Sequence, residues 1–508
     1  MSDKINILEA CEDENLFGSF FRDRDTWAAW RAFMAALFGL PMSDELASHY
    51  RERTGRNDLP TAPSSEAWLV VGRRGGKSFV LALIAVFLSV FRDYRPFLAP
   101  GERATVAIIA ADRKQARTIF RYIKGLLHAV PMLKRLIERE TADAFDLSGS
   151  VTIEVSTASF RTTRGYTFAA ILADEVAFWP AEDSAEPDHA ILAAVRPGMA
   201  TIPGAMLLCA SSPYARRGAL FEAWRDWYGK EDGPLVWHGP TRAMNPTVPQ
   251  DLIDKEMKRD PANALAEFMA EFRKDVEAVF SMDAVEAVTS AEVRERPRRE
   301  SFRHFAFVDP SGGSSDSMTL AIAHNEKGKA VLDLVREVRP PFSPDAVAKE
   351  FADTAKLYGV REVTGDRYAG EWPRERFRAH GVTYQLAKAP RSELYLHMLS
   401  AVNSGQVDLL DLPRLKNQMV GLERRVNRSG RETIDHGPGG HDDVANAAAG
   451  ALWLAERANR TEGVPLVGTS GWHGDASSLC GSATLGGDES VRSPVFIKDE
   501  PSFGFFVG

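Results

Sequence analysis

The sequence predicts an α/β protein with two successive domains, each a β-sheet covered by helices. Three observations lead to this prediction. The chain has 508 residues, more than a single hydrophobic core usually organises. Between residues 66 and 210, short apolar runs alternate with helical stretches, which is typical of a parallel sheet. After residue 302, three strand-like runs follow one another closely before helix and strand alternate again.

The N-terminal segment, residues 1–60, is expected to be helical and to lead into the first sheet. Its large apolar side chains recur at helical spacing, which indicates one buried face. These side chains are Trp27, Trp30, Phe33 and Leu37.

The first sheet is expected to define a domain over residues 61–280. A helix is predicted at 114–130, and a helical stretch at 251–280 that Pro261 interrupts. The predicted strands lie at 68–71, 105–110, 151–155, 169–173 and 206–210.

A charged, arginine-rich stretch, residues 281–301, is predicted to link the two domains. The second domain, residues 302–460, is expected to have three antiparallel strands followed by helix–strand units, which is the order of an RNase H-like fold. Residues 461–508 are rich in Gly and Ser without periodicity, so a flexible tail is predicted. Within the second domain, strands are predicted at 302–308, 318–324, 330–338 and 362–365, and helices at 344–357 and 442–457.

Composition narrows the class of protein. Hydrophobic residues make up 44% and charged residues 26%, the balance of a soluble globular chain. The net charge of -8 argues against a uniformly basic surface, but arginine clusters at 294–303 and 424–431 leave nucleic-acid binding open. Taken singly, each cluster is explained more simply as a solvated surface than as a nucleic-acid-binding patch. The three cysteines lack metal-type spacing, and no apolar run is long enough to span a bilayer, so an intracellular compartment is expected.

A phosphate-binding loop is predicted between the first strand of the sheet and the apolar helix after it. Its glycines let backbone N–H groups point at phosphate oxygens, and the helix N-terminus adds partial positive charge. Lys77 is placed to reach the β- and γ-phosphates of ATP, and Ser78 to offer its hydroxyl to Mg²⁺. A chance Gly-Lys-Ser is disfavoured by the flanking strand and helix. The loop consists of Gly72, Arg73, Arg74, Gly75, Gly76, Lys77 and Ser78.

An acidic pair ends the fourth apolar run of this domain. An apolar strand that ends in adjacent carboxylates fits the Walker B motif, in which Asp174 holds the metal-bound water shell and Glu175 polarises the attacking water. A simple helix cap is the alternative for such a pair. Together with the loop upstream, the pair predicts a RecA-like P-loop ATPase domain with a parallel sheet.

Arginines in two places bear on the charge that develops during phosphoryl transfer. Arg73 and Arg74 lie inside the loop, and Arg161 and Arg164 precede the Walker B strand. An arginine finger accelerates phosphoryl transfer by roughly 10³–10⁵. Arg164 is the preferred candidate, acting on a neighbouring subunit, whereas a surface salt bridge is the competing interpretation for each arginine.

Two hydroxyls, Ser211 and Ser212, end the next strand, where a sensor of the γ-phosphate would lie. A simple turn at this position is the alternative.

A second acidic site is predicted in the C-terminal domain. Asp309 ends its first strand, Asp366 follows its fourth, and Asp442 and Asp443 open the last helix. In an RNase H-like arrangement these carboxylates converge, and their mutual repulsion predicts a site for two Mg²⁺ or Mn²⁺ ions. Two such ions can stabilise both the attacking and the leaving oxygen in phosphodiester hydrolysis. Each aspartate alone could equally be a turn former or a helix N-cap.

Taken in order, the motifs resemble those of one family, the large terminase subunit of tailed double-stranded DNA bacteriophages. The resemblance runs from about residue 15 to 455. It rests on the successive motifs Gly72–Ser78, Leu172–Glu175, Ala210–Pro213, Val308–Pro310 and His441–Asp443.

The resemblance implies an ATP-driven motor that moves viral double-stranded DNA into the procapsid, with a nuclease that cuts concatemeric DNA. It implies that Lys77 and Ser78 bind ATP and Mg²⁺, and that Glu175 activates water. Segment 21–30 is similar to the adenine-side segment of that family. Asn446 stands where many relatives carry another acid, so Asp442 and Asp443 both stay open as the last metal ligand.

The resemblance also implies partners and a location. The portal protein and a small terminase subunit would be partners, with the chain acting as a homo-oligomeric ring, a pentamer, on the portal. No membrane is involved, and the protein would work in the host cell cytoplasm, transiently on the procapsid and not in the mature virion.

Two other functions compete with this interpretation. The first is a helicase-like or repair ATPase whose RNase H-like domain binds DNA without cutting it. A helicase should carry a second RecA-like domain, but the sequence indicates only a single RecA-like domain. The second is a mainly structural assembly protein with a silent nuclease.

Overall fold

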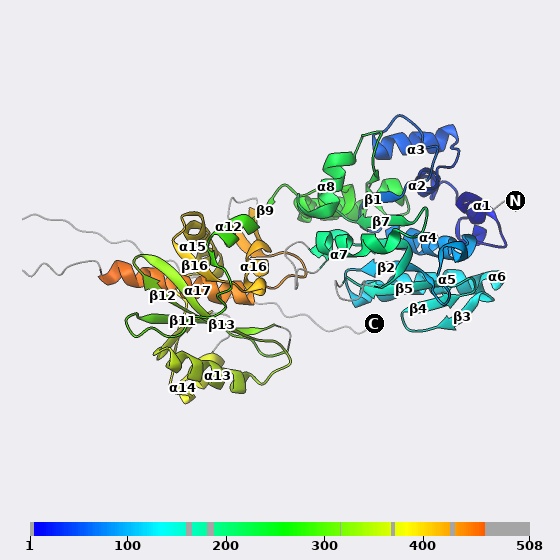
Figure 1. Ribbon diagram of the computed structural model, residues 1–508. Coiled ribbons are helices and arrows are strands. Elements are labelled where there is room, and N and C mark those ends of the chain that lie inside the picture. The colour runs from blue at the N-terminus through cyan, green and yellow to red at the C-terminus, as the bar shows by residue number, and fades with distance from the viewer. Residues whose placement is uncertain are drawn as a thin grey trace, which may run out of the picture. The chain divides into compact units, whose positions relative to one another are not determined.

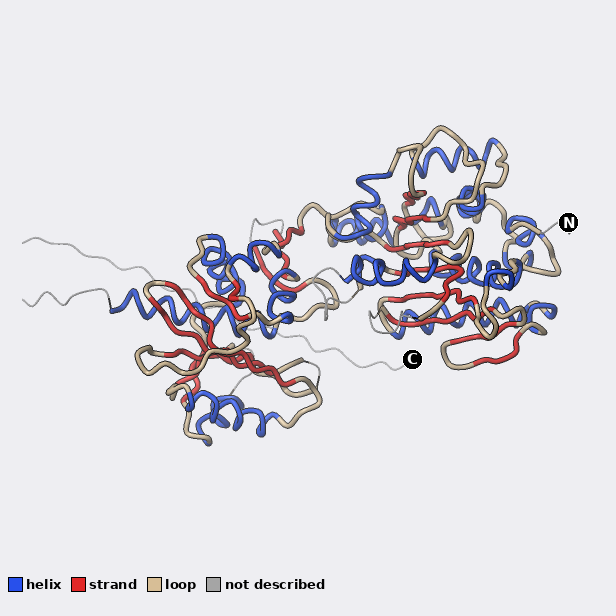
Figure 2. The backbone as a smooth tube through the Cα atoms, viewed as in Figure 1, coloured by secondary structure: helices blue, strands red, loops and turns tan. Residues whose placement is uncertain are grey.

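A computed structural model describes residues 5–158, 165–179, 187–314, 316–366, 371–426 and 432–462. Figure 1 traces the chain, and Figure 2 distinguishes helices from strands. The predicted α/β class is confirmed, because the described residues form two large mixed sheets with helices on their faces. The tail predicted at 461–508 lies outside the described residues from residue 463 onward.

The first sheet has eight strands in the order β3-β4-β5-β2-β6-β7-β1-β8. The strands from β5 to β8 in this order run parallel, and β3 and β4 join antiparallel at one edge. In chain order the strands are β1 (Glu66–Val71), β2 (Ala104–Ala110), β3 (Ile137–Glu140), β4 (Ala144–Leu147), β5 (Val151–Thr157), β6 (Thr167–Asp174), β7 (Met206–Ser211) and β8 (Leu235–Gly239).

Helices cover both faces of this sheet because its strands are almost entirely apolar and must be buried on each side. One face packs against α2, α4 and α5, and the other against α7 and α8. The helices are α1 (Ile7–Glu12), α2 (Ala28–Phe38), α3 (Asp44–Thr54), α4 (Lys77–Phe91), α5 (Arg113–Ala129), α6 (Pro131–Lys134), α7 (Pro187–Val195), α8 (Gly218–Trp227), α9 (Thr241–Met244), α10 (Gln250–Arg259) and α11 (Pro261–Met269). Short 3₁₀ helices are η1 (Gly18–Phe20), η2 (Arg95–Phe97), η3 (Val176–Phe178) and η4 (Arg196–Met199).

The second sheet has seven strands in the order β10-β16-β13-β12-β11-β14-β15. Strands β11, β12 and β13 are antiparallel, and β14 runs parallel to β11, as the sequence predicts for an RNase H-like order. The strands are β10 (Thr289–Ser290), β11 (His304–Asp309), β12 (Met318–Glu326), β13 (Lys329–Val338), β14 (Glu362–Gly365), β15 (Thr383–Leu386) and β16 (Val407–Leu410).

The helices of this sheet lie in two layers, which Figure 1 shows on opposite sides of β11–β13. α17 packs closely on β11, because a Cβ on Gly450 would overlap the ring of Phe307. The close approach brings the start of α17 to the end of β11. The helices are α12 (Met282–Ala287), α13 (Pro344–Leu357), α14 (Trp372–Ala379), α15 (Arg391–Asn403), α16 (Pro413–Val420) and α17 (Asp443–Glu462).

A third, small sheet has the order β18-β17-β9. β9 (Val276–Ala278) lies in the chain between the two large sheets, whereas β17 (Leu422–Val426) and β18 (Glu432–His436) precede α17. Within the predicted linker 281–301 the chain forms α12 and β10, and β10 pairs with β16.

Among the described helices, none combines the length and the apolar character that crossing a bilayer requires.

Candidate active sites

The predicted phosphate loop connects β1 to α4, and its turn is shaped by left-handed residues. Gly76 has φ 99° and Arg74 has φ 61°. The indole Nε1 of Trp30 on α2 donates a hydrogen bond of 2.8 Å to the carbonyl of Gly75. Trp30 is 1% exposed, and a Cβ on Gly76 would lie 3.0 Å from its Nε1. The helical N-terminal segment therefore helps to hold the loop.

Lys77 is buried at the first position of α4, and its Nζ points back into the loop. It donates to the carbonyl of Val71 at 2.8 Å and to Ser212 Oγ at 3.1 Å. It also forms an ion pair of 3.5 Å with Glu175 Oε1. The cation predicted to contact phosphates thus lies where β1, β6 and β7 end side by side.

Ser78 and Asp174 meet in the structure as the Mg²⁺ prediction requires. Ser78 Oγ lies 3.2 Å from Asp174 Oδ2, and Gln115 Nε2 on α5 donates to the same oxygen at 2.6 Å. Burial raises the pKa of Asp174 to about 6, and the charge of Glu175 adds to the effect. Its Oδ1 is buried and finds no hydrogen-bond partner among the residues described. A buried, under-coordinated carboxylate beside a hydroxyl is a donor set that fits a hydrated Mg²⁺.

Glu175 is held in an uncommon backbone conformation, with φ 50° and ψ 45°. Its Oε2 accepts from Ser211 Oγ at 2.9 Å and from the backbone N–H of Ser212 at 3.1 Å. A non-glycine residue in this region is strained, and such strain persists where surrounding contacts fix the residue. The Ser211 hydroxyl and the Ser212 backbone N–H therefore hold the carboxylate of Glu175, and the Ser212 hydroxyl contacts Lys77.

The arginines predicted near the phosphates differ in their positions. Arg73 is 69% exposed and pairs with Glu267 at 3.2 Å, so the competing interpretation of a surface ion pair describes its contact here. The carbonyl of Arg74 accepts from Asn245 Nδ2 at 2.9 Å. Arg161 and Arg164 lie outside the described residues, so the finger prediction stays a prediction.

Asp309 lies at the C-terminal end of β11, where its carboxylate faces the start of α17. Asn446 Nδ2 on α17 donates to Asp309 Oδ2 at 2.8 Å. Burial raises the pKa of Asp309 well above its ordinary value; the Asn446 hydrogen bond opposes the rise, and the charges of other carboxylates add to it. These other carboxylates are those of Asp443, Asp366 and Asp442. The four acids therefore lie near enough for their charges to act on Asp309.

Asp442, directly before α17, and Asp443, its first residue, have different surroundings. Asp442 is buried and accepts from Tyr395 Oη at 2.7 Å, with Arg391 3.0 Å from its Oδ2. Asp443 Oδ2, by contrast, is buried without a hydrogen-bond partner in the part of the chain that the structure describes. Burial raises the pKa of Asp443 to about 6, and the charge of Asp442 adds to the rise.

Asp366 follows β14 directly, and the parallel pairing of Val308 with Gly365 brings it to the same sheet edge as Asp309. A Cβ on Gly365 would overlap the hydroxyl of Tyr384, so the approach to Asp366 is tight. Asp316 contributes electrostatically, because its charge raises the pKa of Asp443, while His441 lowers it.

The carboxylate set fits divalent cations. Several acids share one strand end, and a buried carboxylate oxygen of Asp443 lacks a donor among the described residues. Such like charges are tolerated when cations neutralise them. Asp309, Asp366 and Asp443 are the candidates to hold such cations, whereas Asp442 is already bound by Arg391 and Tyr395.

Sequence reasoning missed four side chains that position the predicted ones. Trp30 and Gln115 support the nucleotide site, and Arg391 and Tyr395 support the acidic one. Gln115 carried a usable signal, since it opens the helix after β2, and β2 neighbours β6 in the sheet. Trp30 was marked by its helical spacing as buried but not as a contact of the loop, and Arg391 and Tyr395 lie on a helix with no local pattern that marks them.

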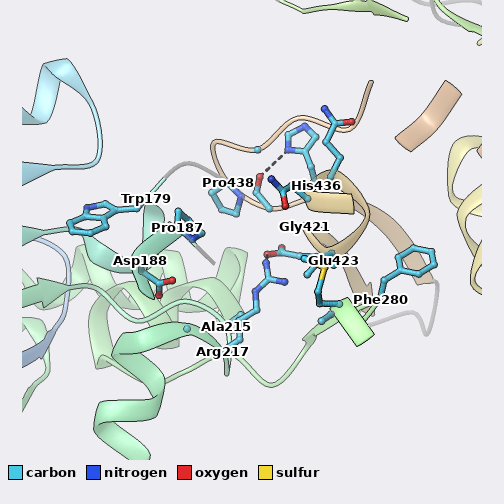
Figure 3. A pocket seen from close by; sticks show the side chains of 18 of the residues that line it. Trp179, Pro187, Asp188, Ala215, Arg217, Phe280, Gly421, Glu423, His436 and Pro438 are labelled. Atoms are coloured by element: carbon cyan, nitrogen blue, oxygen red, sulfur yellow. Dashed lines mark hydrogen bonds and ion pairs between the residues drawn. The ribbon is translucent and has the colours of Figure 1, made fainter. Parts of the chain in front are cut away.

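A cleft of about 740 Å³ is lined by neighbours of both sites, among them Val176 after Glu175 and His441 before Asp442, and Figure 3 shows it from close by. Its lining includes Arg217, Glu423 and His436 but none of the phosphate-loop residues and none of Asp309, Asp366 and Asp443. Glu423 is fully buried and accepts from Tyr214 Oη at 2.6 Å, from Arg217 at 2.5 Å and from Arg425 at 3.1 Å. This carboxylate therefore joins the loop after β7 to β17.

Replacing Glu423 with Ala is expected to destabilise the protein by about 3 kcal/mol, because three partly exposed side chains would lose a shared, fully buried acceptor. Urea unfolding of the full chain measures the loss. Glu432→Ala, which removes the half-exposed partner of Arg424, is the matched control and should have a much smaller effect. Equal losses in the two variants would contradict the role given to Glu423.

Comparison with known proteins gives matches among solved structures. No family model and no curated protein matches the sequence. The large terminase of bacteriophage HK97 is 16% identical, with a TM-score of 0.37, over 84% of this chain and 99% of that one. A large terminase from a thermophilic bacteriophage, solved in complex with ADP, is 13% identical, with a TM-score of 0.35, over 76% and 92%. The large terminase nuclease of another thermophilic phage, G20c, is 16% identical, with a TM-score of 0.30, over 35% and 97%. All three structures are of the family that the sequence motifs resemble.

Proposed function

We propose that this chain is the large subunit of a terminase, which hydrolyses ATP to move viral double-stranded DNA into a procapsid and cuts concatemeric DNA with a metal-dependent endonuclease. One observation carries the proposal: a single chain holds a P-loop site on its first sheet and a separate four-carboxylate site on its second. The first chemistry supplies energy for movement, and the second breaks phosphodiester bonds.

In the nucleotide site, we assign binding of the β- and γ-phosphates to the loop N–H groups and Lys77. Ser78 and Asp174 would hold the Mg²⁺ shell, which neutralises phosphate charge when bound. Glu175 would orient the attacking water and accept its proton. Its contacts with Ser211 and Ser212 support this role, since they fix the carboxylate beside Lys77.

In the acidic site, we assign two Mg²⁺ or Mn²⁺ ions to Asp309, Asp366 and Asp443, where they would supply charge stabilisation for phosphodiester hydrolysis. Asn446 would orient the carboxylate of Asp309. Arg391 and Tyr395 hold Asp442, which supports a positioning role for that residue rather than direct ligation.

The roles of Asp442 and Asp443, at the start of α17, can be separated by substitution. Asp443→Asn is expected to lower plasmid cleavage by about 10³-fold, because it removes a ligand worth several kcal/mol of charge stabilisation. Asp442→Asn is expected to cost about 10–100-fold, the range for residues that orient metal ligands. Initial cleavage rates at saturating Mn²⁺ compare the two, with unchanged ATP hydrolysis as the internal control. A larger loss of cleavage in Asp442→Asn than in Asp443→Asn would mean that Asp442 is the metal ligand and Asp443 the positioning residue.

The remaining parts of the proposal follow the sequence resemblance. Arg164 would act as an arginine finger on a neighbouring subunit of a pentameric ring. The portal protein, a small terminase subunit and double-stranded DNA would be partners, and the work would take place in the host cell cytoplasm on the procapsid.

Two DNA substrates separate the proposed motor from the helicase-like alternative. We expect the full chain to displace the third strand of a triplex in an ATP-dependent manner, as a duplex translocase does, without separating the strands of a forked duplex. It should also cut closed circular DNA in the presence of Mg²⁺ or Mn²⁺. ATP-dependent strand separation without any cutting would favour the helicase-like function and overturn the proposal.

A further inference from the structure

Three buried side chains of the second sheet converge far from the acidic site. They are His304 on β11, His324 on β12 and Asp333 on β13, and each side chain is 1% exposed. His304 begins β11 and Asp309 ends it, so the two groups are separated by about 17 Å along the strand. The cluster plays no part in the activities proposed above and does not depend on them.

Strand register explains why these residues meet. His304 and His324 are direct cross-strand partners of the antiparallel pair β11–β12, so their side chains lie on the same face. Between β12 and β13, Ile322 pairs with Leu334 and Ala323 with Leu332. Asp333 is therefore the extra residue of a β-bulge, a feature that re-aims a side chain relative to the strand's alternation. The bulge lets Asp333 reach the two imidazoles.

The contact atoms lie at distances close to those of a metal coordination sphere. His324 Nδ1 is 2.7 Å and His304 Nε2 is 3.7 Å from the same oxygen, Oδ2 of Asp333. One ligand atom from each of the three residues lies within 4.8 Å of the other two. Tetrahedral Zn²⁺ with bonds of about 2.0–2.2 Å separates its ligand atoms by roughly 3.4 Å, which the two observed distances bracket.

Hydrogen bonding alone leaves this cluster incompletely satisfied. Neither His304 Nε2 nor His324 Nε2 has a hydrogen-bond partner within the described ranges, although both are buried. At 3.7 Å, His304 Nε2 is too far from Asp333 to donate a hydrogen bond. A cation between His304 Nε2, His324 Nδ1 and the carboxylate of Asp333 would satisfy the His304 nitrogen, whereas His324 Nε2 lies outside such a site, 3.7 Å from Glu326 Oε2.

We propose that His304, His324 and Asp333 form a structural site for Zn²⁺ that ties β11, β12 and β13 together at one end. Two imidazoles and one carboxylate are a ligand set that Zn²⁺ accepts, with the fourth position left for water. Mg²⁺ prefers oxygen ligands, so the site discriminates against the ion expected at the acidic cluster.

The test uses the full chain after removal of metals by a chelator. Zn²⁺ is titrated against a chromophoric competitor in excess Mg²⁺, with the Asp309→Asn, Asp443→Asn double variant alongside the parent. We expect one tightly bound Zn²⁺ per chain in both proteins, and a thermal midpoint that rises with Zn²⁺. If the parent binds no stoichiometric Zn²⁺, or if binding disappears in the double variant, the proposal is wrong.

Substitutions of the ligands localise the ion. His304→Gln and Asp333→Asn should each weaken Zn²⁺ binding by about 100-fold or more, since even residues that only orient ligands contribute 10–100-fold. His128→Gln, which alters a partly exposed histidine paired with Glu140, is the matched control and should bind like the parent. Parent-like binding in the His304 and Asp333 variants would overturn the assignment.

A measurement on the unaltered chain covers the case in which a variant does not fold. X-ray absorption at the zinc edge counts imidazole ligands, and the proposed site requires two. The other group of possible ligands among the described residues, Asp435, His436 and Asp442, offers one histidine. A spectrum with fewer than two imidazoles would therefore exclude the site.

Discussion

Lys77→Ala is expected to lower ATP hydrolysis by about a thousandfold while DNA cleavage by the same preparation stays unchanged. Lys77 is a buried cation that already contacts Ser212 and Glu175 at the ends of two strands. Alanine removes the charge that would stabilise the β- and γ-phosphates, and it also releases Glu175 from its ion pair. Steady-state phosphate release measures the first activity, and relaxation of supercoiled plasmid the second.

Lys124→Ala provides the matched control for this substitution. Lys124 lies on α5 with its side chain half exposed and paired with Glu140, outside the nucleotide site. Its replacement should leave ATP hydrolysis unchanged. Retention of parent-like turnover by Lys77→Ala would remove the phosphate-loop assignment, because no other described lysine contacts Ser212 and Glu175.

Asp309→Asn is expected to reduce metal-dependent plasmid cleavage by about 10³-fold and to leave ATP hydrolysis intact. Asparagine keeps the shape and can still accept the hydrogen bond of Asn446, but it removes the negative charge. The pKa of Asp309 is raised in the folded protein, so its ionised form opposes folding above its ordinary pKa. In metal-free buffer near neutral pH the variant should therefore unfold at a higher temperature than the parent.

Addition of Mn²⁺ should reverse that order. The parent gains stability by binding the ion in its folded state, and the variant gains less because a ligand is missing. Asp353→Asn, an exposed residue of α13 that pairs with lysines, is the control and should cleave like the parent. If Asp309→Asn cuts DNA at the parental rate, the acidic cluster is not the nuclease site.

The elements that the sequence predicted best are those with their own local signals. The helix expected at 344–357 is α13, and the strand expected at 362–365 is β14, with the same bounds. Pro344 at the first helical position fixes the start of α13, since its ring suits that position and no other in a helix. Pro261 likewise separates α10 from α11 by beginning the second of them.

Two strands, β3 and β17, escaped prediction because neither carries an apolar run. β3 has the sequence IERE and is mostly exposed, so it carries no apolar run. β17, LERRV, reads as part of a basic surface cluster. In the structure Arg425 pairs with Glu423, and Arg424 pairs with Glu432 across the β17–β18 hairpin. The sequence favours a solvated surface for these two arginines; in the structure each also forms an ion pair within the small sheet, which the spacing of the arginines does not reveal.

The sequence predicts which residues belong to each candidate site, but it does not predict the role of each residue within the site. Lys77, Ser78, Asp174 and Glu175 meet as expected, because carboxyl ends of parallel strands share one sheet edge. The sequence left Asp442 and Asp443 equivalent. Their difference arises from Arg391 and Tyr395 on α15, about 50 residues earlier, and a sequence offers no rule for which neighbour such a helix will touch.

The pairing of β9 with β17 determines where the chain can be divided into fragments. A fragment that starts at residue 302 would lack β9 and β10, and so would expose the edges of β17 and β16. Uncovered edges pair with other chains, and the remaining two-stranded β17–β18 ribbon is marginal by itself. The fragment that starts at residue 302 would also lack Arg296, whose guanidinium donates a hydrogen bond to Asp408 at 2.9 Å. A cut before Val276 keeps these contacts, so the smallest self-sufficient C-terminal piece begins about 25 residues earlier than the change in sequence pattern indicates.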